Sequence, residues 1–257
     1  MQSKLAVQLY TLREACSSDF HQVLRDLKAM GWGGVQLAGY HGHAPAELAA
    51  FIQETGLQVA GMHVSLGRIK HELEELVHEA GLFGTRDIIC PSLPVEMRNE
   101  AGYREARELL NKAAEAVKPT GIRISYHNHS FEFEETVDGQ FALEYMLKPS
   151  ADNLVLAELD VFWVKKAGQE IEHFIALYAN RMPIIHLKDM TADDRRTFAP
   201  IGSGIIDFTP ILHWGEQNGI EWYVVEQDEC DSDPMACVAS SYRYLAALIS
   251  GMGAKVG

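Results

Sequence analysis

The sequence has little that would direct the protein to a membrane or a nucleic acid. In its 257 residues no apolar run approaches the roughly 18 residues that a membrane-spanning helix needs. Basic residues are also few, because 22 Lys and Arg stand against 36 Asp and Glu and give a formal net charge of −14. A surface this acidic repels a phosphate backbone and an anionic bilayer. Nucleic acid and membrane are therefore not expected as partners.

Cysteine is scarce as well, and its four occurrences show no functional spacing. Cys16, Cys90, Cys230 and Cys237 form no Cys-x-x-Cys pair, so reduced thiols are the expected state. Residues 1–9 lack the basic segment, the long apolar stretch and the small-residue cleavage site of a secretory signal. These absences predict a cytoplasmic protein.

The composition that is present indicates one large globular domain. The chain is 47% apolar and 23% charged, which supplies ample material for a core. Its length is typical of a single α/β barrel. Because no Pro/Ser-rich linker, low-complexity tract or internal repeat divides the sequence, we expect one domain over residues 1–257.

Short apolar or β-branched runs alternate with longer segments of helical periodicity along the whole chain. The clearest helical segments are 19–30, 45–55 and 100–118. Strict alternation predicts parallel strands joined by crossover helices, and about 32 residues per unit favour a closed (β/α)8 barrel over an open sheet. The eight expected strands are 5–12, 34–38, 58–64, 87–91, 122–129, 154–161, 183–188 and 222–227.

Active sites of this fold lie at the carboxyl ends of the strands, and here those ends carry metal-ligand residue types. Side chains alternate along a strand, so residues two apart share one face. A single such residue is more often a hydrogen-bonded polar group, but several at successive strand ends favour a bound cation, because buried carboxylates and imidazoles are costly alone. The residues are His63, His127, His129, Glu158, Asp160, His186, Lys188 and Glu226.

Five stretches, 8–13, 126–129, 160–163, 186–189 and 225–228, and the glycine turn at 200–207 carry a resemblance to a known group. They resemble the sugar phosphate isomerase/epimerase group of xylose-isomerase-like barrels, in the same order from residue 5 to about residue 248. The resemblance implies a TIM barrel with one divalent metal ion, and the residue types suit Mn²⁺, Mg²⁺, Co²⁺ or Zn²⁺.

The resemblance also implies which residues hold that ion. The group's aspartate, histidine and glutamate fall on Asp160, His186 and Glu226. The fourth ligand is usually a glutamate, and its position falls on His127 in this sequence. Glu158 or Glu132 could supply the missing carboxylate, and both alternatives stay open.

The activity that the resemblance implies is a metal-dependent sugar isomerase or epimerase, which removes a proton next to a carbonyl and forms an enediolate. Glu226, Glu158 and Lys188 are the expected catalytic residues. Related sugar 3-epimerases use two glutamates, of which only Glu226 is present. The alternative is therefore a dehydratase or hydratase acting on a 3-keto-sugar or an inosose, and inosose dehydratases look similar at this point.

A small carbohydrate is the expected partner, bound by five further residues. For each of these residues plain packing or hydrogen bonding is an equally good interpretation. Barrels of this group often form homo-oligomers, and the sequence leaves the oligomeric state open. The expected substrate contacts are His63, His129, Glu132, Trp163 and Tyr10.

The sequence leaves four further alternatives. Lys188 could instead form an ion pair with Asp189 or Glu158. Gly202 and Gly204 could bind an anion through their N–H groups, although a turn is the favoured interpretation. An endonuclease IV-like enzyme is disfavoured, because it needs more ligands and a basic DNA face, whereas a non-catalytic sugar-binding barrel would keep the pocket without the chemistry.

Overall fold

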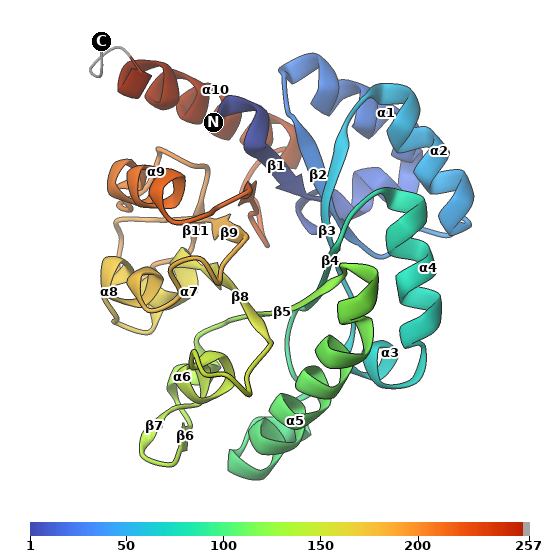
Figure 1. The fold of residues 1–257 in the computed structure, drawn as a ribbon. Coiled ribbons are helices and arrows are strands. Elements are labelled where there is room, and N and C mark those ends of the chain that lie inside the picture. Colours follow the sequence, from blue (N-terminus) through green and yellow to red (C-terminus); the bar gives the residue numbers. More distant parts are fainter. Residues whose placement is uncertain (254–257) are drawn as a thin grey trace.

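The computed structural model describes residues 1–253, and its centre is a closed barrel of eight parallel strands (Figure 1). Around the barrel the strands follow the order β1-β12-β9-β8-β5-β4-β3-β2. The predicted (β/α)8 barrel is therefore confirmed. Its strands are β1 (Leu5–Gln8), β2 (Gly34–Ala38), β3 (Gln58–His63), β4 (Asp87–Cys90), β5 (Arg123–His127), β8 (Leu156–Asp160), β9 (Ile184–Leu187) and β12 (Trp222–Val225).

Helices form a layer around the barrel (Figure 1), and none of those within residues 1–253 is both long and apolar enough to cross a membrane. Two short antiparallel ribbons, β6–β7 (136–141) and β10–β11 (189–199), leave the barrel at its rim. The helices are α1 (Arg13–Met30), α2 (Pro45–Thr55), α3 (Leu66–His71), α4 (Leu73–Phe83), α5 (Glu100–Val117), α6 (Ala142–Leu147), α7 (Val161–Lys166), α8 (Ile171–Ala176), α9 (Phe208–Gln217) and α10 (Pro234–Gly253).

Several strands end earlier than the apolar runs predicted, because polar side chains at their ends start the next element. The side chain of Gln8 accepts a hydrogen bond from the backbone N–H of Tyr10, and a 3₁₀ turn, η2 (Leu9–Leu12), follows β1. Asp160 at the end of β8 accepts the N–H groups of Phe162 and Trp163, which makes it the N-cap of α7. The strand ends therefore place their polar residues at one rim of the barrel.

The interior of the barrel is filled on the side of the strands' amino ends. A small apolar cluster inside the strands is separate from the larger core between barrel and helices. Gly61 in β3 leaves room for this cluster, since a Cβ there would lie 2.6 Å from Ile89 Cδ1. A cavity can therefore form only toward the carboxyl ends. The inner cluster consists of Ala6, Ala60, Ile89, Ile184 and Val224.

Candidate active site

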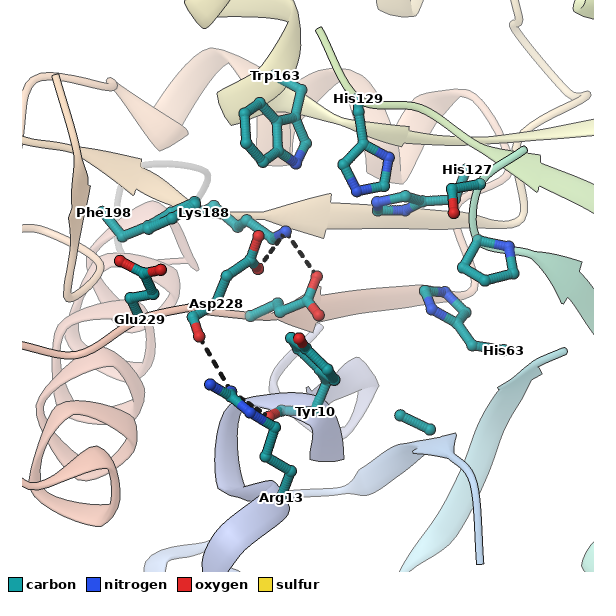
Figure 2. Close-up of a pocket in the computed structure, with 14 residues that line it drawn as sticks. Tyr10, Arg13, His63, His127, His129, Trp163, Lys188, Phe198, Asp228 and Glu229 are labelled. Carbon is teal, nitrogen blue, oxygen red and sulfur yellow. Dashed lines mark hydrogen bonds and ion pairs between the residues drawn. The ribbon is translucent and has the colours of Figure 1, made fainter. Parts of the chain in front are cut away.

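The carboxyl ends of the strands surround a cavity of about 590 Å³, which we call the mouth pocket (Figure 2). Its volume is within the range of small-molecule sites. Of the residues expected at the site, seven line it, while others lie beneath it or behind a strand. The lining residues are Tyr10, Arg13, Ala38, His63, Pro91, Ser92, His127, His129, Trp163, Lys188, Phe198, Glu226, Asp228 and Glu229.

Four buried side chains meet at the base of the mouth pocket. His186 Nδ1 lies 3.2 Å from Glu226 Oε2, and His127 Nε2 lies 3.8 Å from Asp160 Oδ2. Each residue offers one ligand atom, and these four atoms lie within 4.8 Å of one another. The structure thus brings together the four residues that the sequence analysis expected as ligands, and we call them the ligand cluster.

The ligand cluster has the donor set of a divalent-cation site. It combines two imidazole nitrogens with two carboxylate oxygens, a mixture that suits Mn²⁺, Co²⁺, Zn²⁺ and Mg²⁺. Asp160 Oδ2 is fully buried and lies 3.0 Å from the Nζ of Lys188. Burial raises the pKa of Asp160, although Lys188 opposes that shift. Because the four donor atoms converge and are of the types that bind divalent cations, the residues present fit a bound cation.

Lys188 extends from the end of β9 into the centre of the pocket (Figure 2). Its Nζ lies 3.0 Å from Asp160 Oδ2, 2.7 Å from Glu226 Oε2 and 2.7 Å from Asp228 Oδ1. Burial disfavours the charged amine, but the carboxylates of Asp160 and Glu226 outweigh it and raise the pKa of Lys188. Lys188 therefore holds its proton in the free site and is paired with these carboxylates, not with Asp189 or Glu158.

Glu158 does not reach the wall of the mouth pocket. Its carboxylate is fully buried beneath the ligand cluster, with Oε1 2.6 Å from His63 Nε2 and 3.1 Å from His186 Nε2. Burial opposes ionisation, but these two imidazoles hold the pKa of Glu158 well below its usual range. The expectation that Glu158 acts as a base on the substrate is at odds with this position. It lies deeper than Asp160 because it precedes it by two residues, about 7 Å along the strand.

Glu132 lies behind β5, away from the mouth pocket. It is fully buried in the short 3₁₀ turn η5 (Phe131–Phe133), where it accepts the hydroxyl of Tyr126 at 2.6 Å and the N–H of His129 at 2.7 Å. Glu132 was expected to contact the substrate, but its carboxylate does not line the mouth pocket. The carboxylate instead fixes the loop that carries His129 into the pocket.

This buried carboxylate should make the stability depend on pH. Burial raises the pKa of Glu132 to about 7 from an ordinary value of 4.5, so its ionisation destabilises the folded state. Stability from this group is complete below pH 4.5 and falls by roughly 3 kcal/mol as the pH rises through 7. In Glu132→Gln that loss should disappear, which urea unfolding at pH 5 and pH 8 would measure. The exposed Glu134→Gln is the control, and an unchanged pH dependence in Glu132→Gln would contradict the assignment.

Aromatic rings form one wall of the mouth pocket. The ring of Trp163 lies 5.3 Å from that of His129 and 5.7 Å from that of Phe198, which the β10–β11 ribbon contributes. Tyr10 is 44% exposed at the opposite rim, and the guanidinium of Arg13 lies 4.5 Å from the centre of its ring. Such a wall suits the apolar face of a sugar ring.

Several residues of the site were missed by the sequence analysis, among them Asp228, Gln36 and Phe198. Asp228 lines the pocket, and burial together with the Glu226 charge raises its pKa to about 6. Gln36 is a fully buried amide in β2, bonded to His186. Gln36 could have been recognised as an amide in an otherwise apolar strand. Asp228 could have been recognised by its two-residue spacing from Glu226, which places both side chains on one face. Phe198 had no such signal.

The glycine loop that follows the β10–β11 ribbon does not offer its N–H groups to a substrate. The N–H groups of Gly202 and Gly204 both donate to Asp189 Oδ2 at 2.9 Å. A Cβ on Gly204 would lie 2.4 Å from Asp189 Oδ1, so the close approach requires glycine. The loop is the turn that the sequence favoured, and an internal carboxylate already fills the anion position.

Comparison with known proteins agrees with this architecture. Residues 24–247 match the family described as xylose isomerase-like TIM barrel. An inosose dehydratase of Clostridium perfringens is 24% identical over 166 residues, which cover 57% of this chain and 55% of that enzyme; the match thus spans about half of the relative's length. The inosose dehydratase of Geobacillus kaustophilus is 23% identical over 87% of this chain and 83% of its own. A crystal structure of a sugar phosphate isomerase/epimerase from Parabacteroides distasonis has the same fold, with a TM-score of 0.81, 23% identity and coverage of 95% and 94%.

Proposed function

Because the chain belongs to the xylose isomerase-like TIM barrel family, we propose that it removes a proton from the carbon next to the carbonyl of a sugar, a keto-sugar or a cyclitol. The observation that carries this proposal is the buried ligand cluster at the base of the mouth pocket. A divalent ion bound there would polarise a carbonyl and stabilise the negative charge that develops on its oxygen. The fold alone would not indicate this chemistry.

Glu226 is the base that the pocket offers. It lines the cavity and is 6% exposed, whereas Glu158 and Glu132 have no exposed surface there. Burial opposes ionisation, but the Lys188 ammonium and His186 hold the pKa of Glu226 well below its usual range. The carboxylate is therefore ionised, which a general base must be before it can accept a proton. A substrate carbon within hydrogen-bond reach of it would lose that proton to Glu226.

Dehydration is the second candidate, and the pair formed by Lys188 and Glu226 favours it. The two groups lie 2.7 Å apart, so a proton acceptor and a proton donor face the same part of the substrate. Glu226 would take the proton next to the carbonyl, and the electron pair of the broken C–H bond would form a C=C bond. The C–O bond to the neighbouring carbon breaks, and its hydroxyl leaves as water with a proton from Lys188. The inosose dehydratases among the relatives agree with this candidate.

The pocket favours a substrate without phosphate. Lys188 is already paired with three carboxylates, and Arg13 donates to the backbone oxygens of Tyr10 and Asp228. The N–H groups of Gly202 and Gly204 are also occupied. Lys188 and Arg13 are the lysine and the arginine among the residues that line the pocket. An uncharged, hydroxyl-rich substrate therefore fits better than a sugar phosphate.

Metal removal tests the proposed function. Proton NMR in D₂O with Mg²⁺ would follow the proton next to the carbonyl in ketohexoses, 3-keto-glucosides and inososes. We expect one of these classes to lose that signal, EDTA to stop the loss and added Mg²⁺ or Co²⁺ to restore it. A new vinylic signal would identify dehydration. Exchange that persists after EDTA, or no exchange by protein that holds metal, would contradict the proposal, and the second result would indicate a sugar-binding barrel.

A further inference from the structure

A chain of hydrogen bonds lies beneath the ligand cluster and joins β1, β2, β8 and β9. It runs from Gln8 through Gln36 to Glu158 and His186, and all four side chains are fully buried. We propose that this buried layer holds a proton on Nε2 of His186, so that Nδ1 is the atom that binds a cation in the ligand cluster. Glu158 is then a positioning residue and not a catalytic base. The inference rests on the proposed metal site.

The orientation of both amides follows from groups that can act in only one way. The backbone N–H of Tyr10 can only donate, so the atom of Gln8 that faces it at 3.3 Å is the oxygen. Gln8 Nε2 then donates to Gln36 Oε1 at 2.7 Å. The other end of the same amide, Gln36 Nε2, then donates to Glu158 Oε2 at 2.6 Å. The orientation of Gln36 thus follows from the backbone N–H at the start of the chain.

This orientation determines which nitrogen of His186 carries a proton. His186 Nε2 faces two acceptors, Gln36 Oε1 at 2.7 Å and Glu158 Oε1 at 3.1 Å. A lone pair on Nε2 would meet both oxygens, so Nε2 must be protonated. Nε2 is therefore not available to a cation, and Nδ1 is the nitrogen that His186 can offer to one. That atom lies 3.2 Å from Glu226 Oε2, on the side of the ligand cluster.

The same argument separates two overlapping groups of ligand-type residues. His63, His127, Glu158 and His186 also present atoms within 4.8 Å of one another. On this side, however, His63 Nε2 lies 2.6 Å from Glu158 Oε1, and His186 Nε2 already contacts Gln36. The nitrogens near Glu158 are therefore hydrogen-bond donors, and the cation belongs on the opposite side of the imidazoles. Replacing a carboxylate that orients a metal-binding histidine in this way typically weakens metal binding about 10–100-fold.

The test reads the tautomer directly, with Zn²⁺ as the probe. Long-range ¹H–¹⁵N spectra of the zinc-loaded protein, labelled at histidine, should show His186 protonated at Nε2 and bound to zinc at Nδ1. In Glu158→Gln a donor amide replaces one acceptor oxygen, so Gln36 must turn or His186 must lose its Nε2 proton. We expect a shift of the His186 tautomer and about 10–100-fold weaker zinc binding by competition titration. Glu79→Gln, a buried glutamate paired with Tyr40 and Arg68, is the matched control and should change neither.

Three further variants keep the outcome decisive. Gln36→Met removes the contact to His186 even if Glu158→Gln does not fold, and it should shift the same tautomer. His63→Gln should keep zinc binding, whereas Asp160→Asn should lose it. Zinc on His186 Nε2, an unchanged tautomer in folded Glu158→Gln and Gln36→Met, or loss of zinc in His63→Gln would overturn the inference. If zinc binds as expected while no substrate exchanges its proton, the proposed function fails and the positioning role stands.

Discussion

Glu226→Gln is expected to abolish proton exchange and turnover while the fold persists. The amide keeps the size of the side chain and can still contact Lys188, but it cannot accept a proton from carbon. A general base of this kind contributes about 10²–10⁴-fold to the rate, and the variant also loses one charged oxygen of the ligand cluster. Exchange rates in D₂O at saturating Mg²⁺, with a thermal melt as the check of the fold, measure the effect.

Two comparisons make this result specific. Glu172→Gln, an exposed glutamate on α8, should retain the wild-type rate. His186→Ala should also abolish metal-dependent exchange, because it removes a nitrogen of the ligand cluster. Wild-type exchange in Glu226→Gln would remove Glu226 from the mechanism, and activity restored by excess metal would assign it to metal binding alone.

Lys188→Met should give the largest change in stability. The substitution removes the ammonium that lies within 3.0 Å of Asp160 and Glu226 and leaves buried carboxylates without their partner. Removing one member of a buried ion pair costs about 3–5 kcal/mol, which lowers the melting temperature by roughly 10 °C in a domain of this size. Thermal melts in EDTA would show the loss.

Divalent cations should then stabilise this variant more than the wild type. The same carboxylates attract the ammonium and would attract the cation, so a metal that binds only the folded state replaces part of the missing charge. Melting temperature against Mg²⁺ concentration would measure this. Lys112→Met is the control, since its pair with Glu108 is exposed to solvent and contributes little to stability. A wild-type melting temperature of Lys188→Met in EDTA would contradict the assignment of charges.

The sequence was sufficient for the barrel and for the residues of the ligand cluster. Alternating apolar runs determine parallel strands, and parallel strands place their carboxyl ends at one rim. Among the polar residues at that rim, the family resemblance singled out His127, Asp160, His186 and Glu226. Alternation also says that Glu158 and Asp160 share a face. It does not say which layer of the barrel each occupies, and Glu158 lies in the deeper one.

Loops limited the remaining predictions. Glu132 follows β5 in a 3₁₀ turn, where no strand periodicity fixes the direction of a side chain, and it turns back to Tyr126 instead of facing the pocket. Phe198 reaches the wall from a ribbon whose position depends on the hydrogen bonds between β10 and β11. The role of Gln36 could not be predicted for another reason. The hydrogen-bond partners of an amide in a barrel strand depend on which residues lie beside it on the neighbouring strands.

The pairing of β1 with β12 has a consequence for the order of events during synthesis. The register joins Leu5 to Tyr223 and Val7 to Val225, so the barrel closes only when the last strand has left the ribosome. Loop closure over such a separation is slow compared with local contacts. Glu226 follows β12 directly, so the ligand cluster is complete only after translation of this strand. Until then the nascent chain exposes two unpaired strand edges, one of them on β1. Exposed edges of this kind are the surfaces that chaperones protect during synthesis.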